Sequence, residues 1–137
     1  MTSNGFPDGA SALTHILVVT DPQKSKQFYL DVLGAKLYSE YGTSVVLEFL
    51  GNWLLLVEGG KPTEDKPTIV FTAPKDPDSL DHSFTIRIND CASAYNDLLT
   101  RGAEFLTPPK DWGGEIRAFF RDPDGHLFEI SEIPNRR

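Results

Sequence analysis

The sequence predicts an α+β fold made of two tandem βαβββ modules, whose mixed sheets curl into cups and carry their helices on the outer face of each cup. One observation is a repeated order of strand-like and helix-like apolar runs. Another is a shared spacing of helix-capping aspartates, helix-ending glycines and hairpin glycines, which a tandem repeat explains. These pairs are Asp21 and Asp90, Gly34 and Gly102, and Gly51 and Gly125, which lie 69, 68 and 74 residues apart.

The first module is expected over residues 12–58. Residues 13–20 are β-branched and apolar, which is typical of a strand. Asp21 and Pro22 then predict a helix start, because aspartate accepts free N–H groups there and proline fits the first helical position. The helix is expected to end before Gly34. Three strands follow near residues 35–41, 44–50 and 53–57, with a tight turn at Gly51–Asn52.

Residues 59–81 are rich in proline and glycine and predict a connector, with a possible short strand over residues 68–72. The second module is expected over residues 82–133, and the two modules together make one domain. Its helix is predicted over residues 91–100, directly after the capping residue Asp90. Its strands are predicted over residues 83–88, 103–107, 115–121 and 127–133, with the turn Asp122–Gly125 between the last two.

Composition narrows the classes of function. The 137 residues include 13 Lys and Arg against 20 Asp and Glu, which gives a formal net charge of −7. We expect no nucleic-acid partner and no membrane partner, because phosphate backbones and anionic bilayers attract basic surfaces. The single cysteine, Cys91, cannot form an internal disulfide and is expected in the core. With no signal-peptide pattern in view, we expect a cytoplasmic protein.

Two segments resemble those of a known superfamily. Residues 21–34 (Asp-Pro-Gln-Lys-Ser-Lys-Gln-Phe-Tyr-Leu-Asp-Val-Leu-Gly) resemble the first helix of vicinal-oxygen-chelate proteins, and residues 122–129 (Asp-Pro-Asp-Gly-His-Leu-Phe-Glu) resemble their closing hairpin. This superfamily includes glyoxalase I, bleomycin-resistance proteins, fosfomycin-resistance enzymes and extradiol dioxygenases. The resemblance implies two curled sheets that each cup a concave site, and it implies a homodimer.

Alternation along the predicted strands separates side chains that pack on the helices from side chains that point into the cup. The apolar positions of residues 84–88 are expected on the helix side, because packing there buries them. The residues at the alternate positions of each strand are then expected to point into the cup. The residues predicted to line the cup and bind a ligand are Thr14, Trp53, Leu55, Ser83, Arg87, Arg117 and Phe119, with Trp112 on a nearby loop and Glu129 as the catalytic candidate.

The resemblance also implies that a metal, in members that use one, is held at cup positions that here carry Thr14, Leu55, Ser83 and Glu129. Only the glutamate is a usual ligand for Zn, Ni, Mn or Fe, which favour imidazole together with carboxylate. We therefore expect no cofactor and no tightly bound metal. The alternative is a divalent-metal site made of His15, His82 and Glu129. That site requires a β-bulge in both histidine strands, because each histidine lies one residue out of register.

Three further features have a functional and a structural interpretation. Glu129 could act as a general base or accept a hydrogen bond from a ligand, or it could pair with Arg87 or Arg117. We expect the pair, because a buried carboxylate needs a partner. The loop 112–114 contains two glycines and is expected as a mobile lid. His126 lies in the predicted hairpin turn and is expected to be exposed.

Three functions agree with these residues. The first is a metal-independent protein that binds a small aromatic or anionic molecule in the cup, similar to the bleomycin-resistance branch. The second is a metal-dependent lyase, thiol transferase or dioxygenase, similar to glyoxalase I or the extradiol enzymes. The third is a dimeric interaction module without a small ligand. The sequence lacks the motifs for phosphate cradling, serine hydrolysis, thiol redox chemistry and dinucleotide binding.

Overall fold

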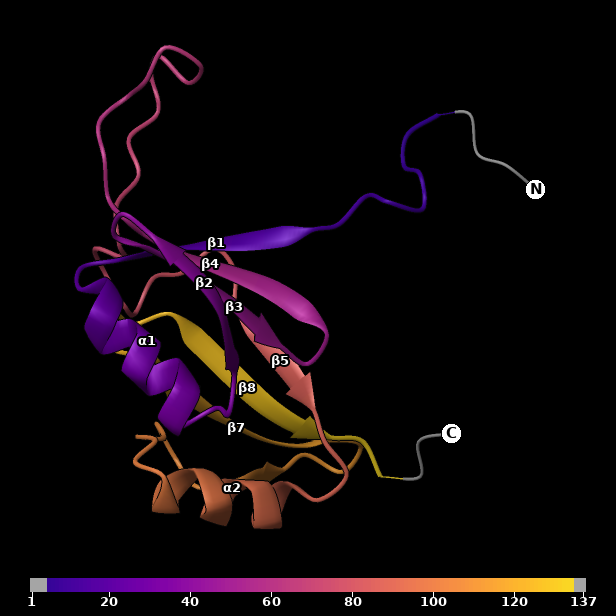
Figure 1. The fold of residues 1–137 in the computed structure, drawn as a ribbon. Helices are drawn as coiled ribbons and strands as arrows, with labels where there is room; N and C mark the ends of the chain where they lie inside the picture. The colour runs from indigo at the N-terminus through magenta and orange to yellow at the C-terminus, as the bar shows by residue number, and fades with distance from the viewer. Residues whose placement is uncertain (1–4, 135–137) are drawn as a thin grey trace.

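The computed structural model describes residues 5–134 and folds them into two four-stranded mixed sheets with one helix each (Figure 1). Sheet 1 has the strand order β1-β4-β3-β2, in which β1 and β4 are parallel and the other pairs antiparallel. The elements of this first half are β1 (Thr14–Val19), α1 (Pro22–Asp31), β2 (Lys36–Tyr41), β3 (Ser44–Phe49) and β4 (Asn52–Glu58).

Sheet 2 repeats this topology in the second half of the chain, with the order β5-β8-β7-β6 and a parallel pair of β5 and β8. The tandem βαβββ prediction is therefore confirmed. Neither helix in the described part of the chain is long and apolar enough to cross a membrane. The elements are β5 (Phe84–Arg87), α2 (Cys91–Thr100), β6 (Lys110–Asp111), β7 (Ile116–Arg121) and β8 (Leu127–Glu132).

Both helices begin and end where the sequence predicts. The Asp21 carboxylate accepts hydrogen bonds from the N–H groups of Gln23 and Lys24 at 3.1 and 3.2 Å, and the Asp90 carboxylate accepts one from Ser93 at 3.0 Å. These bonds satisfy donors that have no partner inside the helix. A glycine with a positive φ follows each helix, so the chain can turn back into the next part of its module.

Each sheet has one face that packs on the helices, the helix face, and an opposite face that we call the cup face. Along β1, Leu17 and Val19 are buried on the helix face, whereas Thr14 and Ile16 are exposed on the cup face. The other long strands alternate in the same way. The cup face of sheet 1 includes Thr14, Ile16, Val46, Trp53 and Leu55, and that of sheet 2 includes Thr85, Arg87, Arg117, Phe119, Glu129 and Ser131.

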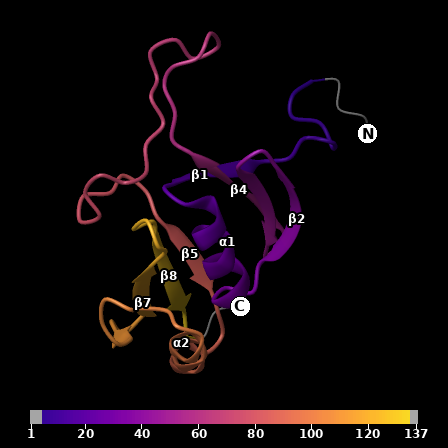
Figure 2. The ribbon, with the colours of Figure 1, turned by 60° about the vertical axis from the view of Figure 1, so that its left-hand side comes forward.

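The helix faces of the two sheets pack against each other, so both modules share one hydrophobic core. Figure 2 shows α1 between sheet 1 and sheet 2. The Tyr29 hydroxyl on α1 donates a 2.6 Å hydrogen bond to the Asp122 carboxylate in the hairpin of sheet 2, and its ring centroid lies 6.0 Å from that of Phe128. The cup faces therefore lie on the sides of the sheets that are turned away from the shared core.

Two predicted details of the strands are wrong. Residues 103–107 form no strand, because Phe105 makes a single bridge to Phe120 and the following Pro108 and Pro109 cannot donate N–H groups to a sheet. The short β6 pairs with β7 instead. The tight turn after β3 centres on Leu50–Gly51, one residue earlier than expected, since both residues have positive φ.

The connector carries no strand at residues 68–72, which make only the isolated bridge of Gly60 with Phe71. Residues 59–71 form an arm that projects from the body in both views (Figures 1 and 2). Gly59 is required at the base of this arm, because a Cβ there would lie 2.7 Å from the carbonyl oxygen of Phe71. Ile69 and Val70 on the arm are exposed apolar side chains.

Candidate functional site

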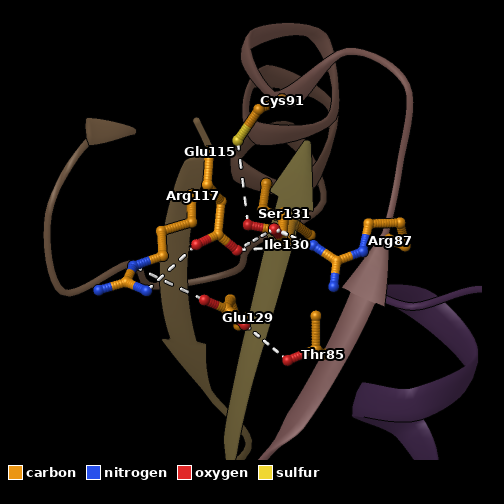
Figure 3. Close-up of polar contacts among 8 residues, drawn as sticks. All are labelled: Thr85, Arg87, Cys91, Glu115, Arg117, Glu129, Ile130 and Ser131. Atoms are coloured by element: carbon orange, nitrogen blue, oxygen red, sulfur yellow. Dashed lines mark hydrogen bonds and ion pairs between the residues drawn. The ribbon is translucent and has the colours of Figure 1, made fainter. Parts of the chain in front are cut away.

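The cup face of sheet 2 carries a cluster of polar side chains from three strands and the residue before β7. Figure 3 shows the two arginines on either side of one glutamate, with a second glutamate below them. All of these groups except Ser131 and Glu129 are at least partly open to solvent. We call this set the arginine cluster: Thr85, Arg87, Glu115, Arg117, Glu129 and Ser131.

Glu129 lies at the centre of β8 and is 7% exposed. The Thr85 hydroxyl donates a 2.6 Å hydrogen bond to its Oε1, and Nε of Arg117 lies 3.7 Å from its Oε2. The expected ion pair is confirmed with Arg117, whereas Arg87 pairs elsewhere. Because both carboxylate oxygens already have partners, the side chain is held rigidly on the cup face.

Glu115, which the sequence reasoning missed, bridges both arginines. Its Oε2 lies 3.5 Å from Nη1 of Arg87, and its Oε1 accepts from Nη1 of Arg117 at 3.3 Å. Ser131 donates a short hydrogen bond to Glu115 and accepts one from Arg87 at 2.5 Å. The bond from Ser131 and the nearby guanidinium charges hold the pKa of the Glu115 carboxyl below its usual range.

Aromatic side chains extend this cluster. The Arg117 guanidinium lies 5.4 Å from the ring centroid of Trp112 and 5.6 Å from that of Phe119, and Lys110 lies 5.1 Å over Trp112. Trp112 is 61% exposed, so its ring is accessible to a ligand. The loop expected as a lid is a closed turn here, since the Trp112 N–H donates to the Glu115 carbonyl at 2.8 Å.

The cup face of sheet 1 differs in chemistry, because its side chains are mostly apolar. A hollow of about 310 Å³ opens on it beside Trp53 and Thr14. The Trp53 ring meets Tyr38 edge to face at 4.9 Å between centroids. Tyr38 was not predicted, because it occupies a register shift in β2 that strand alternation cannot show.

The structure brings the predicted ligand-binding residues together in two groups rather than one. Arg87, Arg117, Phe119 and Trp112 gather on sheet 2 with Glu129. Thr14, Trp53 and Leu55 lie on the cup face of sheet 1. Ser83 is exposed just before β5 and makes no contact with the arginine cluster in the hydrogen bonds of the described residues. A single chain therefore presents the predicted residues on two separate sheets.

Of the three histidines, His15 lies on the helix face of β1, whereas His82 precedes β5 and His126 lies in the hairpin turn before β8. The His15 ring packs 4.6 Å from Phe84 and 5.2 Å from His82, measured between centroids. His126 is not exposed as predicted, because its Nε2 lies 2.8 Å from the Val18 carbonyl oxygen, where β1 meets the hairpin. These rings belong to the contact between modules.

The side chains present do not fit a metal of the kind that the fold family implies. Glu129 points to the cup face and is engaged by Thr85 and Arg117, whereas His15 lies against Phe84 on the helix face. Within residues 5–134, no group of three or more His, Cys, Asp or Glu residues is placed to hold a metal ion.

Two further features are a buried cysteine in the second module and a crevice between the modules. Cys91 is buried, and burial raises the pKa of its thiol, with the nearby carboxylates of Glu132, Asp90 and Glu129 acting in the same direction. The thiol is therefore a core group rather than a nucleophile. An apolar crevice of about 270 Å³ opens beside His15, with Phe84 and Phe128 among its lining residues.

His15 predicts a pH-dependent stability. Burial lowers the pKa of its imidazole below 6.5, and the nearby His82 and His126 lower it further. The folded state therefore binds fewer protons than the unfolded state, so the free energy of unfolding falls as the pH drops below 6.5 and levels off below the folded pKa. We expect His15→Gln to reduce this loss, measured by urea unfolding from about pH 7.5 to about pH 5.5.

The matched control is His82→Gln, which removes the neighbouring imidazole but leaves His15 able to titrate. Its pH slope should lie between those of the wild type and of His15→Gln. Equal slopes for the wild type and His15→Gln would show that His15 has no such effect.

A family model described as Glyoxalase/Bleomycin resistance protein/Dioxygenase superfamily matches residues 12–130. The chain is similar to a Metallothiol transferase FosB from Lysinibacillus sphaericus, at 32% identity over 123 residues that cover 87% of this chain and 80% of the relative. Its fold is similar to a glyoxalase/bleomycin resistance protein/dioxygenase from Nocardioides, with a TM-score of 0.73, 23% identity, and 93% and 89% of the two chains covered. It is also similar to TnmS3, an antibiotic binding protein from Streptomyces, with a TM-score of 0.63, 20% identity, and 90% and 96% covered.

Proposed function

Because this chain belongs to the Glyoxalase/Bleomycin resistance protein/Dioxygenase superfamily, we propose that it binds a small aromatic molecule with an anionic group, in a cup shared by two copies and without a tightly bound metal. The observation that carries this proposal is the arginine cluster with the exposed ring of Trp112 beside it. Guanidinium groups recognise carboxylates and other oxyanions, and an adjacent indole offers a surface for stacking.

The need for two copies follows from the directions of the cup faces. Within one chain, the apolar wall of sheet 1 and the arginine cluster of sheet 2 lie on separate sheets, each on the face turned away from the shared core. A second copy can place its sheet 2 opposite sheet 1 of the first, and the same contact then forms a second, equivalent cup. Each cup has an apolar wall with Trp53 and a charged wall with Arg87 and Arg117, which suits an amphipathic ligand.

A metal-dependent thiol transferase is the second candidate, since the relative from Lysinibacillus sphaericus is named a metallothiol transferase. It would use His15, His82 and Glu129 with Zn, Ni, Mn or Fe. Glu129 lies on the cup face of sheet 2 and is engaged by Thr85, whereas His15 lies on the helix face of sheet 1, and this separation favours the metal-free binder. An interaction module without a ligand is the third candidate, and the same experiments distinguish it.

The proposal is tested by titrating the purified full chain with anilinonaphthalene sulfonate (ANS), a planar aromatic anion, and with phenylnaphthylamine, its neutral counterpart. We expect saturable ANS binding that quenches tryptophan fluorescence. Arg117→Gln should weaken ANS binding by about tenfold, because it removes a charge-assisted contact, and should spare the neutral probe. Trp53→Ala should weaken both probes, because it removes part of the apolar wall.

The matched control is Arg121→Gln, since that arginine ends the same strand but donates to the Pro77 carbonyl and the Asp78 carboxylate. This variant should bind ANS with the affinity of the wild type. Light scattering of the wild type should give the mass of two chains, as the shared cup requires. Equal ANS affinity in the wild type, Arg117→Gln and Trp53→Ala would place the probe away from both walls of the cup and would contradict the proposal.

Elemental analysis separates the two leading candidates. We expect less than about half an equivalent of transition metal per chain, because hydroxyl and carboxylate donors without imidazole hold such metals weakly. A full equivalent that is lost in His15→Ala would favour the thiol transferase. Saturable probe binding with no effect of metal removal would favour the metal-free binder, and no binding of either probe would favour the interaction module.

A further inference from the structure

We propose that the Glu115 carboxylate occupies the anion-binding position between Arg87 and Arg117 in the free protein. A ligand's anionic group must displace it from the two arginines. This inference rests on the proposed function and names the residue that sets the selectivity of the site. Glu115 contacts one guanidinium through each carboxylate oxygen, at 3.5 and 3.3 Å, as a bridging carboxylate of a ligand would. Figure 3 shows its side chain between those of the two arginines.

The charges of the cluster explain why a carboxylate must leave. Two arginines face two glutamates, Glu115 and Glu129, so their formal charges cancel. An anionic ligand added to this balanced set would meet two carboxylates of its own sign. When one glutamate side chain moves away, both guanidinium groups can bind the anionic group of the ligand. The energetic gain is the difference between the ligand's contacts and those of the displaced glutamate.

The structure identifies Glu115 as the carboxylate that moves. Glu129 is buried in the middle of β8 and fixed by Thr85, whereas the Glu115 side chain is 28% exposed and precedes the first residue of β7. Gly113, with a φ of +97°, and Gly114 come directly before it. The Trp112 N–H holds the Glu115 carbonyl, so the side chain moves outward by rotating about its own bonds, and Ser131 can then donate its hydroxyl to the ligand.

The test uses Glu115→Gln, which keeps the size and hydrogen-bonding groups of the side chain and removes its negative charge. We expect this variant to bind ANS at least about threefold more tightly than the wild type, a change in the range measured for partly exposed ion pairs. Its affinity for phenylnaphthylamine should be unchanged, because the neutral probe has no group for the arginines. The difference between the two probes should shrink at high salt.

The matched control is Glu104→Gln, which changes the net charge equally at an exposed position after α2, outside the arginine cluster. It should leave both affinities unchanged, and melting temperatures should show that both variants are folded. If the wild type binds ANS through Arg117 but Glu115→Gln binds it equally or more weakly, Glu115 organises the arginines instead and this inference is wrong. If neither protein binds ANS, the proposed function fails together with the inference.

Discussion

Asp122→Ala should lower the free energy of unfolding by about 3–5 kcal/mol, the range expected when a buried, hydrogen-bonded charge site is broken. The Asp122 carboxylate is buried and accepts three hydrogen bonds: from the Tyr29 hydroxyl at 2.6 Å, and from the N–H groups of Asp124 and His126 at 3.0 and 2.8 Å. The same side chain therefore shapes the last hairpin and ties it to α1. Its removal leaves a buried phenolic hydroxyl without an acceptor.

Urea unfolding followed by far-ultraviolet circular dichroism measures this loss. The matched control is Tyr29→Phe, which removes only the hydrogen bond from the Tyr29 hydroxyl to Asp122 and keeps both bonds that Asp122 accepts inside the turn. We expect it to cost about 1.5–3 kcal/mol, the usual value of a hydrogen bond to a charged group. A loss in Asp122→Ala no larger than that in Tyr29→Phe would mean that the turn does not depend on the carboxylate.

Phe128→Ala should destabilise the fold by a similar amount, about 3–5 kcal/mol, because a large buried ring leaves a cavity that the core cannot close. The ring is 1% exposed and stacks on Phe84 at 4.7 Å and on Phe120 at 5.5 Å between centroids. Tyr29, on α1 of the first module, also packs on the Phe128 ring, with 6.0 Å between the two ring centroids. Phe128 thus belongs to the cores of both modules at once.

The control is Phe119→Ala, which removes a half-buried ring from the cup face of the same sheet. Its cost should be about 1 kcal/mol, because less apolar surface returns to water. Chemical unfolding curves of both variants give the comparison, and each should keep a single cooperative transition. Separate transitions for the two halves in Phe128→Ala would show that the modules fold independently of their contact.

Local signals explain why so much of the fold could be predicted. Asp21 and Asp90 cap helices through bonds to residues two or three positions ahead, and the turn at Asp122 closes within five residues. Strand alternation depends on neighbours in the chain, so the cup-facing parity of Arg117 and Glu129 was correct. These are interactions that a short window of sequence contains.

The missed features depend on distant partners. Glu115 opens the predicted strand 115–121 with the cup-facing parity of Arg117, but its role depends on Arg87, which lies on another strand. His126 was predicted to be exposed because its turn is polar, but Val18 lies beside it across the module contact. The contact between the helix faces of the two modules could not be predicted either. The apolar alternation of the strands is the same whether a module packs on its own helix alone or also on the other module.

Each strand alternates between residues on the helix face and residues on the cup face. Neighbouring residues of one strand are therefore constrained in different ways. On β8, Phe128 and Ile130 are constrained by a core common to both modules, whereas Glu129 and Ser131 between them touch only cup-face groups. Substitutions at the latter positions change the polar groups of the cup face, whereas substitutions at Phe128 or Ile130 disturb the shared core. The chemistry of the cup and the packing of the core are therefore set at separate, alternating positions of the same strand.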